Sequence, residues 1–470
     1  MIRNQTKHAG DAAGNPRPKW QGLGAPRWSP LAPTPVAHAN HEDPGWRADK
    51  DNLVRRFAFY MAVAFVFVRF SMIHEILTFH FGVTAYLPWI FGVPAILGML
   101  LSGGIRRSFR FKPAYFWTAF ALWLIIATPF SFWKGGSVDL LRYYFRTEFP
   151  MLFLVAGLPV DWRECRQMMS AIALSGFVNI AIWHWFIRIS EGRMYLEFGS
   201  IANANDFAAH LMVVLPFLLF IVLAGARSWS IKVAALALIV VGIGLAMSTG
   251  SRGGLLALVA GCGFLLLKSP GRVRIVFAVI APLIAMLAIR MMPEYAFQRQ
   301  ATLFAEQDPA NEQFSELAGS NQARLNLLKT SVQATLEHPI VGVGPGQFLD
   351  YEGFKSIQSG RRGAWQVAHN SYTQVSSEAG LPALFFLLAA LVSTYVLLSK
   401  TYRQARAKKE QRPIAMAAFC IMLSLVGFCV SILFLSLIYK YYLPVLSGLA
   451  ISLASAAERE FAAAPQQPTA

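Results

Sequence analysis

Long apolar runs recur along most of this chain, and short polar segments separate them. A helix needs roughly 20 apolar residues to cross the ~30 Å hydrocarbon core of a bilayer. Because lipid offers no hydrogen-bond partner to the backbone, such runs predict helices rather than open strands. The pattern therefore predicts an all-α polytopic membrane protein with about twelve transmembrane helices. The predicted spans are 57–78, 83–102, 113–132, 147–160, 166–188, 206–225, 230–249, 253–268, 272–292, 379–399, 413–434 and 437–456.

The composition supports this class. Apolar residues make up 55% and charged residues 14% of the 470 residues, whereas charged residues make up about a quarter of a soluble domain. The formal net charge is +17. Most of that charge lies in short loops between apolar runs, so positive-inside sorting explains it and no nucleic-acid partner is expected.

Basic residues gather in alternate loops and thereby predict the orientation of the spans. The clusters are Arg106, Arg107, Arg110 and Lys112; Arg163 and Arg166; Lys268, Arg272 and Arg274; and Lys400, Arg403, Arg406, Lys408, Lys409 and Arg412. With both termini inside, every cluster faces the cytoplasm. Lys440, which is flanked by Tyr439, Tyr441 and Tyr442, then faces the opposite side.

This topology divides the chain into five parts. Residues 1–56 are rich in Pro, Gly, Ala and basic side chains and lack the apolar core of a signal peptide, so they predict a disordered cytoplasmic tail. Residues 457–470 predict a second cytoplasmic tail. Residues 57–292 carry nine spans, 293–378 form one large, partly helical outer loop, and 379–456 carry three spans.

The outer loop contains an amphipathic pattern. Apolar residues repeat at three-to-four spacing at Leu325, Leu328, Val332 and Leu336, with Arg324, Lys329 and Gln333 off that stripe. This spacing predicts a helix that ends at His338-Pro339 and lies on the outer membrane surface or over the bundle. A tight turn through Gly342, Gly344, Pro345 and Gly346 is expected to follow.

Arg252 is the leading candidate for binding an anion. It lies in Ser251-Arg252-Gly253-Gly254, between two apolar spans at the outer surface. The glycines allow close approach of backbone amides, a helix N-terminus favours negative charge, and the guanidinium fork matches phosphate oxygens. The alternative is an interfacial arginine that snorkels to lipid headgroups.

A second outer segment carries Arg193 and then Asn203-Ala204-Asn205-Asp206. For Asp206 the default interpretation is a helix N-cap. For Asn205 and Arg193, contact with a sugar or phosphate and a role in loop structure stay open alternatives. Four cysteines, Cys165, Cys262, Cys420 and Cys429, lie in or beside apolar runs and are expected to be buried packing residues.

The end of the large loop holds the candidate catalytic groups. His369 can act as a general base, because imidazole titrates near neutral pH, or it can be structural. Glu378, at the lip of the next span, can orient the imidazole or be the base itself.

Three further features of the large loop have open interpretations. Arg324 alone reads as a solvated charge, and His338 as a helix C-terminal cap or a substrate contact. The Asp350-Tyr351-Glu352 pair has the spacing of a weak metal site, but no metal site is predicted from it.

The ordered set of motifs between residues 190 and 400 resembles the O-antigen ligase and O-antigen polymerase superfamily of bacterial envelope glycosyltransferases. The matching pieces are Gly192-Arg193, Asn203-Ala204-Asn205-Asp206-Phe207-Ala208, Ser248-Thr249-Gly250-Ser251-Arg252-Gly253-Gly254, Arg324, His338-Pro339-Ile340-Val341-Gly342-Val343-Gly344-Pro345-Gly346-Gln347-Phe348, His369-Asn370-Ser371-Tyr372 and Glu378-Ala379-Gly380. Each motif is weak alone, but their order is specific. The first five spans match only in general character.

The resemblance implies a multi-pass protein of the bacterial inner (cytoplasmic) membrane with its active site facing the periplasm. Such enzymes transfer a glycan from undecaprenyl pyrophosphate to an acceptor hydroxyl with inversion, and they use no nucleotide sugar, required metal or cofactor. The implied partners are the lipid-linked glycan, an acceptor glycan or lipid, membrane lipids and a polysaccharide chain-length regulator. By position, Arg252 and Arg324 would hold the pyrophosphate with help from Arg193, and His369 would deprotonate or orient the acceptor hydroxyl.

Three functions remain to be distinguished. The leading hypothesis is a polymerase of exopolysaccharide or O-antigen repeat units, and the second is a ligase that transfers glycan to lipid A core or to protein. A transporter of small anions is the alternative from another class, because it also needs charged residues within spans. Arg69, His74 and Glu75 in the first predicted span form the only such cluster.

Overall fold

The computed structural model describes residues 49–190, 193–196, 199–201, 203–224, 228–269, 271–301, 312–360, 362–363 and 365–463. All of them belong to one compact unit, Gly45–Ala470. Most of the two predicted tails lies outside the described residues, although the first long helix already begins at Leu53 and the last one continues to Ala463.

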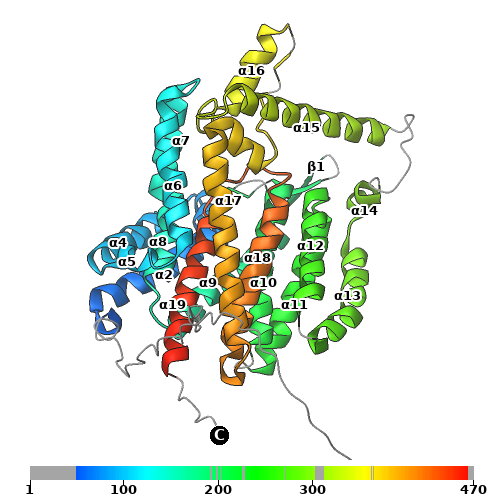
Figure 1. Cartoon of the computed structure of the whole chain (residues 1–470). Helices are drawn as coiled ribbons and strands as arrows, with labels where there is room; N and C mark the ends of the chain where they lie inside the picture. The colour runs from blue at the N-terminus through cyan, green and yellow to red at the C-terminus, as the bar shows by residue number, and fades with distance from the viewer. Residues whose placement is uncertain are drawn as a thin grey trace, which may run out of the picture. The chain divides into compact units, whose positions relative to one another are not determined.

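The described part of the chain is almost entirely helical (Figure 1). The first helices are α2 (Leu53–Ser71), α3 (Ile73–Phe81), α4 (Leu87–Leu101), α5 (Gly104–Ser108), α6 (Lys112–Ala127), α7 (Lys134–Tyr143), α8 (Pro150–Gly157) and α9 (Trp162–Phe186). They are followed by α10 (Ala204–Leu223), α11 (Trp229–Ser248), α12 (Arg252–Lys268), α13 (Gly271–Met291) and α14 (Glu294–Ala301). The remaining helices are α15 (Glu312–Glu337), α16 (Phe348–Gln358), α17 (Ser371–Ala405), α18 (Arg412–Ser431) and α19 (Tyr442–Ala463). Short turns of helix, η1 (Thr128–Phe130), η2 (Tyr144–Glu148) and η3 (Lys409–Gln411), join some of them.

The helices support a multi-pass membrane protein. Within the described residues, 6 helices are long and apolar enough to cross a membrane, or up to 7 if one bent pair counts as a single span. Each of the predicted spans overlaps a helix, but several of these helices, such as α4 and α8, are shorter than a bilayer requires by themselves. The structure therefore establishes a membrane-embedded bundle and not the predicted number of spans.

The first predicted span is broken. Residues 57–78 fall on α2 and α3, which meet at Met72 with an angle of 56° between them. Met72 adopts a left-handed conformation, φ +56°, which ends α2 because a right-handed helix cannot continue through it. The apolar composition of this stretch gave no sign of the break.

A small hairpin departs from the all-α prediction. Strands β1 (Ile187–Ser190) and β2 (Arg193–Leu196) pair antiparallel, with Ser190 opposite Arg193. The hairpin extends the end of α9 and precedes α10. It thus belongs to the predicted outer segment that carries Arg193.

Helix α15 runs across the ends of the bundle helices, and α16 lies at the same end (Figure 1). The predicted helix and its end at His338-Pro339 are confirmed, but its predicted apolar stripe does not form the buried face. Leu325, Val332 and Leu336 are 44%, 43% and 74% exposed, whereas Leu327 is 3% exposed. Ser331, Ala334 and Thr335 share the buried side with Leu327, and Thr335 Oγ1 lies 2.8 Å from Ser376 Oγ of α17. Helix α15 thus docks through Leu327 and through small and hydroxyl side chains, whereas Leu325, Val332 and Leu336 remain exposed.

The predicted glycine turn is present and fixes the bend of α17. Gly342, Gly344 and Gly346 all have positive φ. Val343 N and Gly344 N donate to the carbonyls of Ser377 and Glu378, both at 2.8 Å. On the α17 side of this contact, Gly380 has φ +79°, and a Cβ there would lie 1.9 Å from Ile340 O. Only glycine fits so close to the neighbouring backbone, so the turn and the kink depend on each other.

Candidate functional site

The segment 432–441 between α18 and α19, called here the α18–α19 loop, is the centre of the candidate site. The start of α17 is held to it through Ser371, whose Oγ donates to Leu435 O at 2.7 Å and accepts from Leu437 N at 3.0 Å. The Ser371 amide donates to Ile432 O at 2.9 Å. A buried serine that bonds the loop in both directions fixes the loop against the helix start.

His369 is positioned by the same loop. Its backbone amide donates to Ser436 Oγ at 3.0 Å, and its backbone is left-handed, with φ +52°. Asn370 caps α17, its Oδ1 accepting from Tyr372 N at 2.9 Å and Thr373 N at 3.1 Å. A non-glycine residue in this backbone region carries strain, which persists only where the surroundings enforce it. The half-buried His369 is thus fixed just ahead of a capped helix.

Arg252 begins α12, as the sequence predicted, and its helix start packs against the α18–α19 loop. Ser251 caps the helix by accepting from Gly254 N at 3.1 Å. A Cβ on Gly253 would lie 3.0 Å from Phe434, which is two residues from the serine that holds His369. Arg252 and His369 therefore flank one short loop although they are far apart in sequence.

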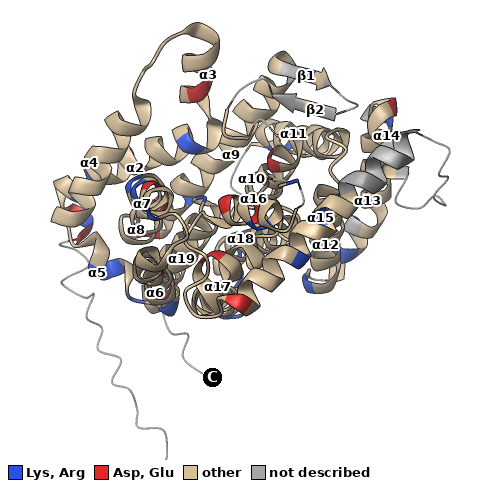
Figure 2. Ribbon diagram, turned by 90° about the horizontal axis from the view of Figure 1, so that it is seen from above, with Lys and Arg blue, Asp and Glu red and all other residues tan. Residues whose placement is uncertain are grey.

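Arg324 lies beside Arg252. Arg252 Nη1 donates to Asn321 Oδ1 at 3.2 Å, and Asn321 is one helical turn before Arg324, on the same side of α15. Burial, and then the positive charge of Arg252, lower the pKa of Arg324. Seen from above, α15 passes beside the end of α12 (Figure 2). Two guanidinium groups from distant segments thus converge, an arrangement that a bound anion stabilises.

Glu378 is buried and committed to internal hydrogen bonds. Its Oε2 accepts from the Tyr439 hydroxyl at 2.7 Å and from Gly346 N at 3.0 Å, and its Oε1 accepts from Gln374 Nε2 at 3.3 Å. The carboxylate thus joins the glycine turn, α17 and the α18–α19 loop. None of these three hydrogen bonds involves His369.

The other outer segment lies partly at the site. Asn205 is buried in the first turn of α10, where its backbone amide donates to Asn203 Oδ1 at 2.9 Å. Asn203, and not Asp206, is the N-cap of α10. A Cβ on Gly254 would lie 2.9 Å from Ala208 Cβ, so the first turns of α10 and α12 pack together. Arg193 lies on β2, and its side chain is outside the described residues.

His338 lies away from the two arginines. It follows the last residue of α15, 14 positions after Arg324, which corresponds to about 21 Å along a helix. Its exposed ring contacts Tyr351 edge to face, with the ring centroids 5.8 Å apart. The structure does not bring His338 to Arg252 and Arg324.

Glu352, of the acidic pair Asp350 and Glu352 that follows the glycine turn, is held by internal hydrogen bonds. Glu352 is buried, and its carboxylate accepts from Trp365 N and Ser356 Oγ, both at 2.9 Å. Among the described residues, no group of three or more His, Cys, Asp or Glu side chains could hold a metal ion. All four cysteines are free; Cys165 and Cys420 are buried, as predicted for packing residues, whereas Cys262 and Cys429 are only half-buried.

The sequence indicated neither the role of the α18–α19 loop nor its second anchor. Arg69 Nη2 and Glu148 Oε1 form an ion pair at 2.7 Å, and Glu148 Oε2 accepts from Tyr441 N at 2.8 Å. The Tyr441 hydroxyl donates to Arg69 O at 3.0 Å. The tyrosines around Lys440 were the available signal, because polar aromatics at the edge of a span need partners. Glu148 is fully buried, so this ion pair is one of the interior connections between α2, η2 and the α18–α19 loop.

A comparison with protein families identifies part of this region. Residues 237–388 match the model of the family described as O-Antigen ligase. The match covers α12, α15 and the start of α17, and so includes Arg252, Arg324, His338, His369 and Glu378. Arg193 and Asn205 lie before it. A search of the curated proteins finds no match.

Proposed function

We propose that this chain, which carries an O-antigen ligase family domain in residues 237–388, is an inverting glycosyltransferase that uses a lipid-pyrophosphate donor. It transfers a glycan from undecaprenyl pyrophosphate to an acceptor hydroxyl. The family match supports lipid-linked glycan transfer in general. The residue roles, the twelve spans, the inner-membrane location and the periplasmic site are parts of the proposal.

The observation that carries the proposal is the meeting of Arg252 and Arg324. Arg252 donates to Asn321, one turn before Arg324, and the positive charge of Arg252 contributes to lowering the pKa of Arg324. Two guanidinium forks at the start of a helix suit a pyrophosphate, which carries several negative charges. They also supply the charge neutralisation for which many phosphate-transfer sites use a divalent cation.

In the proposed reaction the acceptor oxygen attacks the anomeric carbon of the donor glycan. The new glycosidic bond forms as the bond from that carbon to the pyrophosphate oxygen breaks, and the leaving group is undecaprenyl pyrophosphate. His369 accepts the hydroxyl proton, and Arg252 and Arg324 stabilise the charge that develops on the leaving group. A single displacement from the opposite face inverts the anomeric carbon.

Within this chemistry, polymerisation of exopolysaccharide or O-antigen repeat units is the leading role. The length of the chain and the twelve proposed spans favour it. Ligation to lipid A core or to protein is the second candidate, and the description of the matched family favours it. Both roles use the same donor and differ in the acceptor.

Reconstitution of the full chain with a defined undecaprenyl-pyrophosphate glycan tests the function. A ladder of lengthened carrier-linked glycan identifies a polymerase, and a single transfer to added lipid A core identifies a ligase. Purified protein that moves an anion into liposomes while leaving the lipid-linked glycan unchanged would overturn the proposal in favour of transport.

The same assay tests the assigned residues. Arg252→Ala and His369→Ala are expected to lower turnover by about 10²–10³-fold, as does removal of one charge-stabilising donor or general base in other enzymes. Arg324→Lys is expected to lose at least about tenfold, because an ammonium group cannot form the two-pronged contact. Lys329→Gln, on the exposed side of α15, is the control and should retain full activity. Normal product from His369→Ala would exclude it as the base.

A further inference from the structure

A groove lies between α2 and α9, far from Arg252 and Arg324 in the fold. It is bounded by Tyr60, Val63 and Phe67 of α2 and by residues of the first half of α9, and it encloses about 610 Å³. This volume falls within the range of ~300–1,000 Å³ that is usual for small-ligand sites. Tyr60 and Leu174, on its two walls, are 51% and 54% exposed, so the groove opens laterally to the surroundings of the bundle.

The groove is held open by contacts at both ends. At one end Arg55 binds Glu164 through two contacts, with Nη1 2.8 Å from Oε2 and Nη2 3.0 Å from Oε1. At the other end Ser175 Oγ donates to Phe67 O at 3.3 Å. The two helices are therefore fixed on either side of the groove, and its shape is built into the fold.

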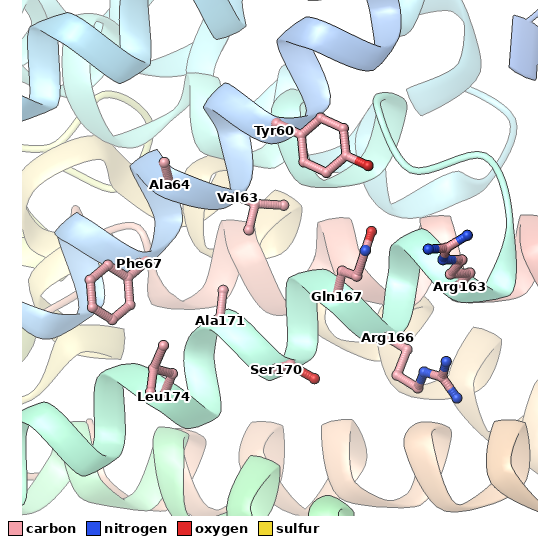
Figure 3. A pocket seen from close by; sticks show the side chains of 10 residues that line it. All are labelled: Tyr60, Val63, Ala64, Phe67, Arg163, Arg166, Gln167, Ser170, Ala171 and Leu174. Atoms are coloured by element: carbon pink, nitrogen blue, oxygen red, sulfur yellow. The ribbon is translucent and has the colours of Figure 1, made fainter. Parts of the chain in front are cut away.

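The lining changes character along the groove (Figure 3). Phe67 and Leu174 lie at one end, and Arg163, Arg166 and Gln167 lie at the other (Figure 3). Such a gradient matches a lipid, whose chains are apolar and whose headgroup is polar.

The charged end of the groove is positive without a compensating acid. The ten lining residues include two arginines and no carboxylate. The neighbouring acids are engaged elsewhere: Glu164 binds Arg55, and Asp161 lies 3.6 Å from Lys50. Within the described residues, no ion pair joins Arg163 or Arg166 to a carboxylate. Both arginines also occupy the first turns of α9, where the helix itself favours negative charge.

We propose that this groove binds one anionic glycerophospholipid, with its phosphodiester on Arg163 and Arg166 and an acyl chain along Val63, Phe67 and Leu174. Arginines supply the charge-assisted bonds that a phosphate requires, and a basic groove between membrane helices is a recurrent place for such headgroups. The positive-inside pattern assigns this end to the cytoplasmic leaflet. The site is thus separate from the proposed donor site, which lies at the opposite ends of the helices.

Native mass spectrometry of the full chain in detergent tests the proposal. The protein is titrated with phosphatidylglycerol and, separately, with phosphatidylcholine of the same acyl chains. One phosphatidylglycerol molecule is expected to bind more tightly than phosphatidylcholine. The double variant Arg163→Gln/Arg166→Gln should weaken that binding by about thirtyfold, since each basic side chain near an anionic headgroup contributes roughly fivefold.

Two further variants keep the test specific. Lys408→Gln/Lys409→Gln removes the same charge from exposed positions that do not line the groove, and its binding should equal that of the parent. Ala64→Phe narrows the apolar part and should weaken phosphatidylglycerol binding while leaving both arginines in place. Equal binding of the two lipids, or an equal loss in both charge variants, would overturn the proposal. Displacement of phosphatidylglycerol by undecaprenyl phosphate at equal concentration would instead assign the groove to the carrier lipid.

Discussion

At the scale of single residues, His369 and Glu378 differ in what surrounds them. His369 is half-buried and held through its backbone, whereas the Glu378 carboxylate is buried and accepts hydrogen bonds from Tyr439, Gly346 and Gln374. A general base must reach the proton that it removes. We therefore propose His369 as the base and Glu378 as a positioning residue.

Glu378→Gln is expected to retain most of the activity and to lose stability. Glutamine can still accept from Tyr439 and Gly346 through its one carbonyl oxygen, but its amide group faces the Gln374 donor. The expected cost is about 1–3 kcal/mol, the range for a buried hydrogen bond that loses its acceptor. Thermal unfolding in detergent and turnover are measured together, with Tyr439→Phe as the matched variant that removes the partner hydroxyl. A folded Glu378→Gln protein without turnover would restore Glu378 as the base.

At the scale of secondary structure, the glycine turn and the kink of α17 show how two elements constrain each other. Gly380 and Gly360 both have positive φ, at +79° and +72°. A Cβ on Gly380 would meet Ile340 O at 1.9 Å, whereas a Cβ on Gly360 would meet nothing within 4 Å. Comparing substitutions at Gly360 and Gly380 therefore separates the cost of backbone strain from the cost of a steric clash.

Gly380→Ala is expected to prevent accumulation of folded protein or to lower its unfolding midpoint far more than Gly360→Ala does. Alanine at Gly360 adds only left-handed strain, about 1–2 kcal/mol. Alanine at Gly380 adds the same strain and forces the 339–346 segment away from α17. Folded yield by size exclusion and the unfolding midpoint give the comparison. Equal effects of the two substitutions would show that residues 339–346 can shift away from α17 without loss of stability.

Helix α15 shows what periodicity can and cannot predict. The three-to-four spacing of Leu325, Leu328, Val332 and Leu336 correctly predicts a helix and its end at His338-Pro339. It does not predict the buried face, because α15 docks through Leu327, Ser331, Ala334 and Thr335. Small side chains allow close helix contact, and hydropathy gives them little weight.

Leu327→Ala is expected to loosen α15 from the bundle, and Leu336→Ala is not. Truncating a buried leucine costs about 2–5 kcal/mol, whereas Leu336 is 74% exposed. Limited proteolysis of α15 and the unfolding midpoint measure the difference. If Leu336→Ala is the more damaging variant, the predicted stripe and not the observed face carries the docking.

The same limit applies to the candidate site. Arg252 and His369 were predicted from local motifs, namely a charge between glycines and a histidine before a helix cap. Their approach through Phe434 and Ser436 could not be predicted, because it depends on packing between segments far apart in the chain. The break at Met72 was missed for a related reason, since an apolar run looks the same whether or not its backbone turns.

At the scale of the whole molecule, buried charges join the early helices to the last one. Arg69 of α2 pairs with Glu148, which also accepts from the backbone amide of Tyr441, the last residue before α19. In the first predicted span, Glu75 Oε2 accepts from Ser200 N at 2.6 Å, and His74 lies 3.7 Å from Glu75. These charges thus have structural partners, which weakens the anion-transport alternative.

Glu148→Gln is expected to lower stability by about 3–5 kcal/mol, because it leaves the Arg69 charge buried without its counter-ion. Asp139→Asn is the control, since Asp139 pairs with Arg142 at 3.1 Å on an exposed surface where such pairs contribute little. Unfolding midpoints at one heating rate compare them. In the double variant Arg69→Gln/Glu148→Gln, part of the loss should be recovered. Equal midpoints for Glu148→Gln and Asp139→Asn would contradict the role of the buried pair.

The α18–α19 loop has a consequence for any attempt to excise the region that matches the family model. The family match ends at residue 388, yet His369 is held by Ser436, Glu378 by Tyr439 and the start of α12 by Phe434. A fragment cut at the borders of the match would contain nearly all of the proposed reactive groups but not the loop that spaces them. Residues 237–388 are therefore not expected to form the site when separated from the rest of the chain. Chimeras that exchange this domain must therefore keep residues 432–441 together with the segment 369–378 that they hold.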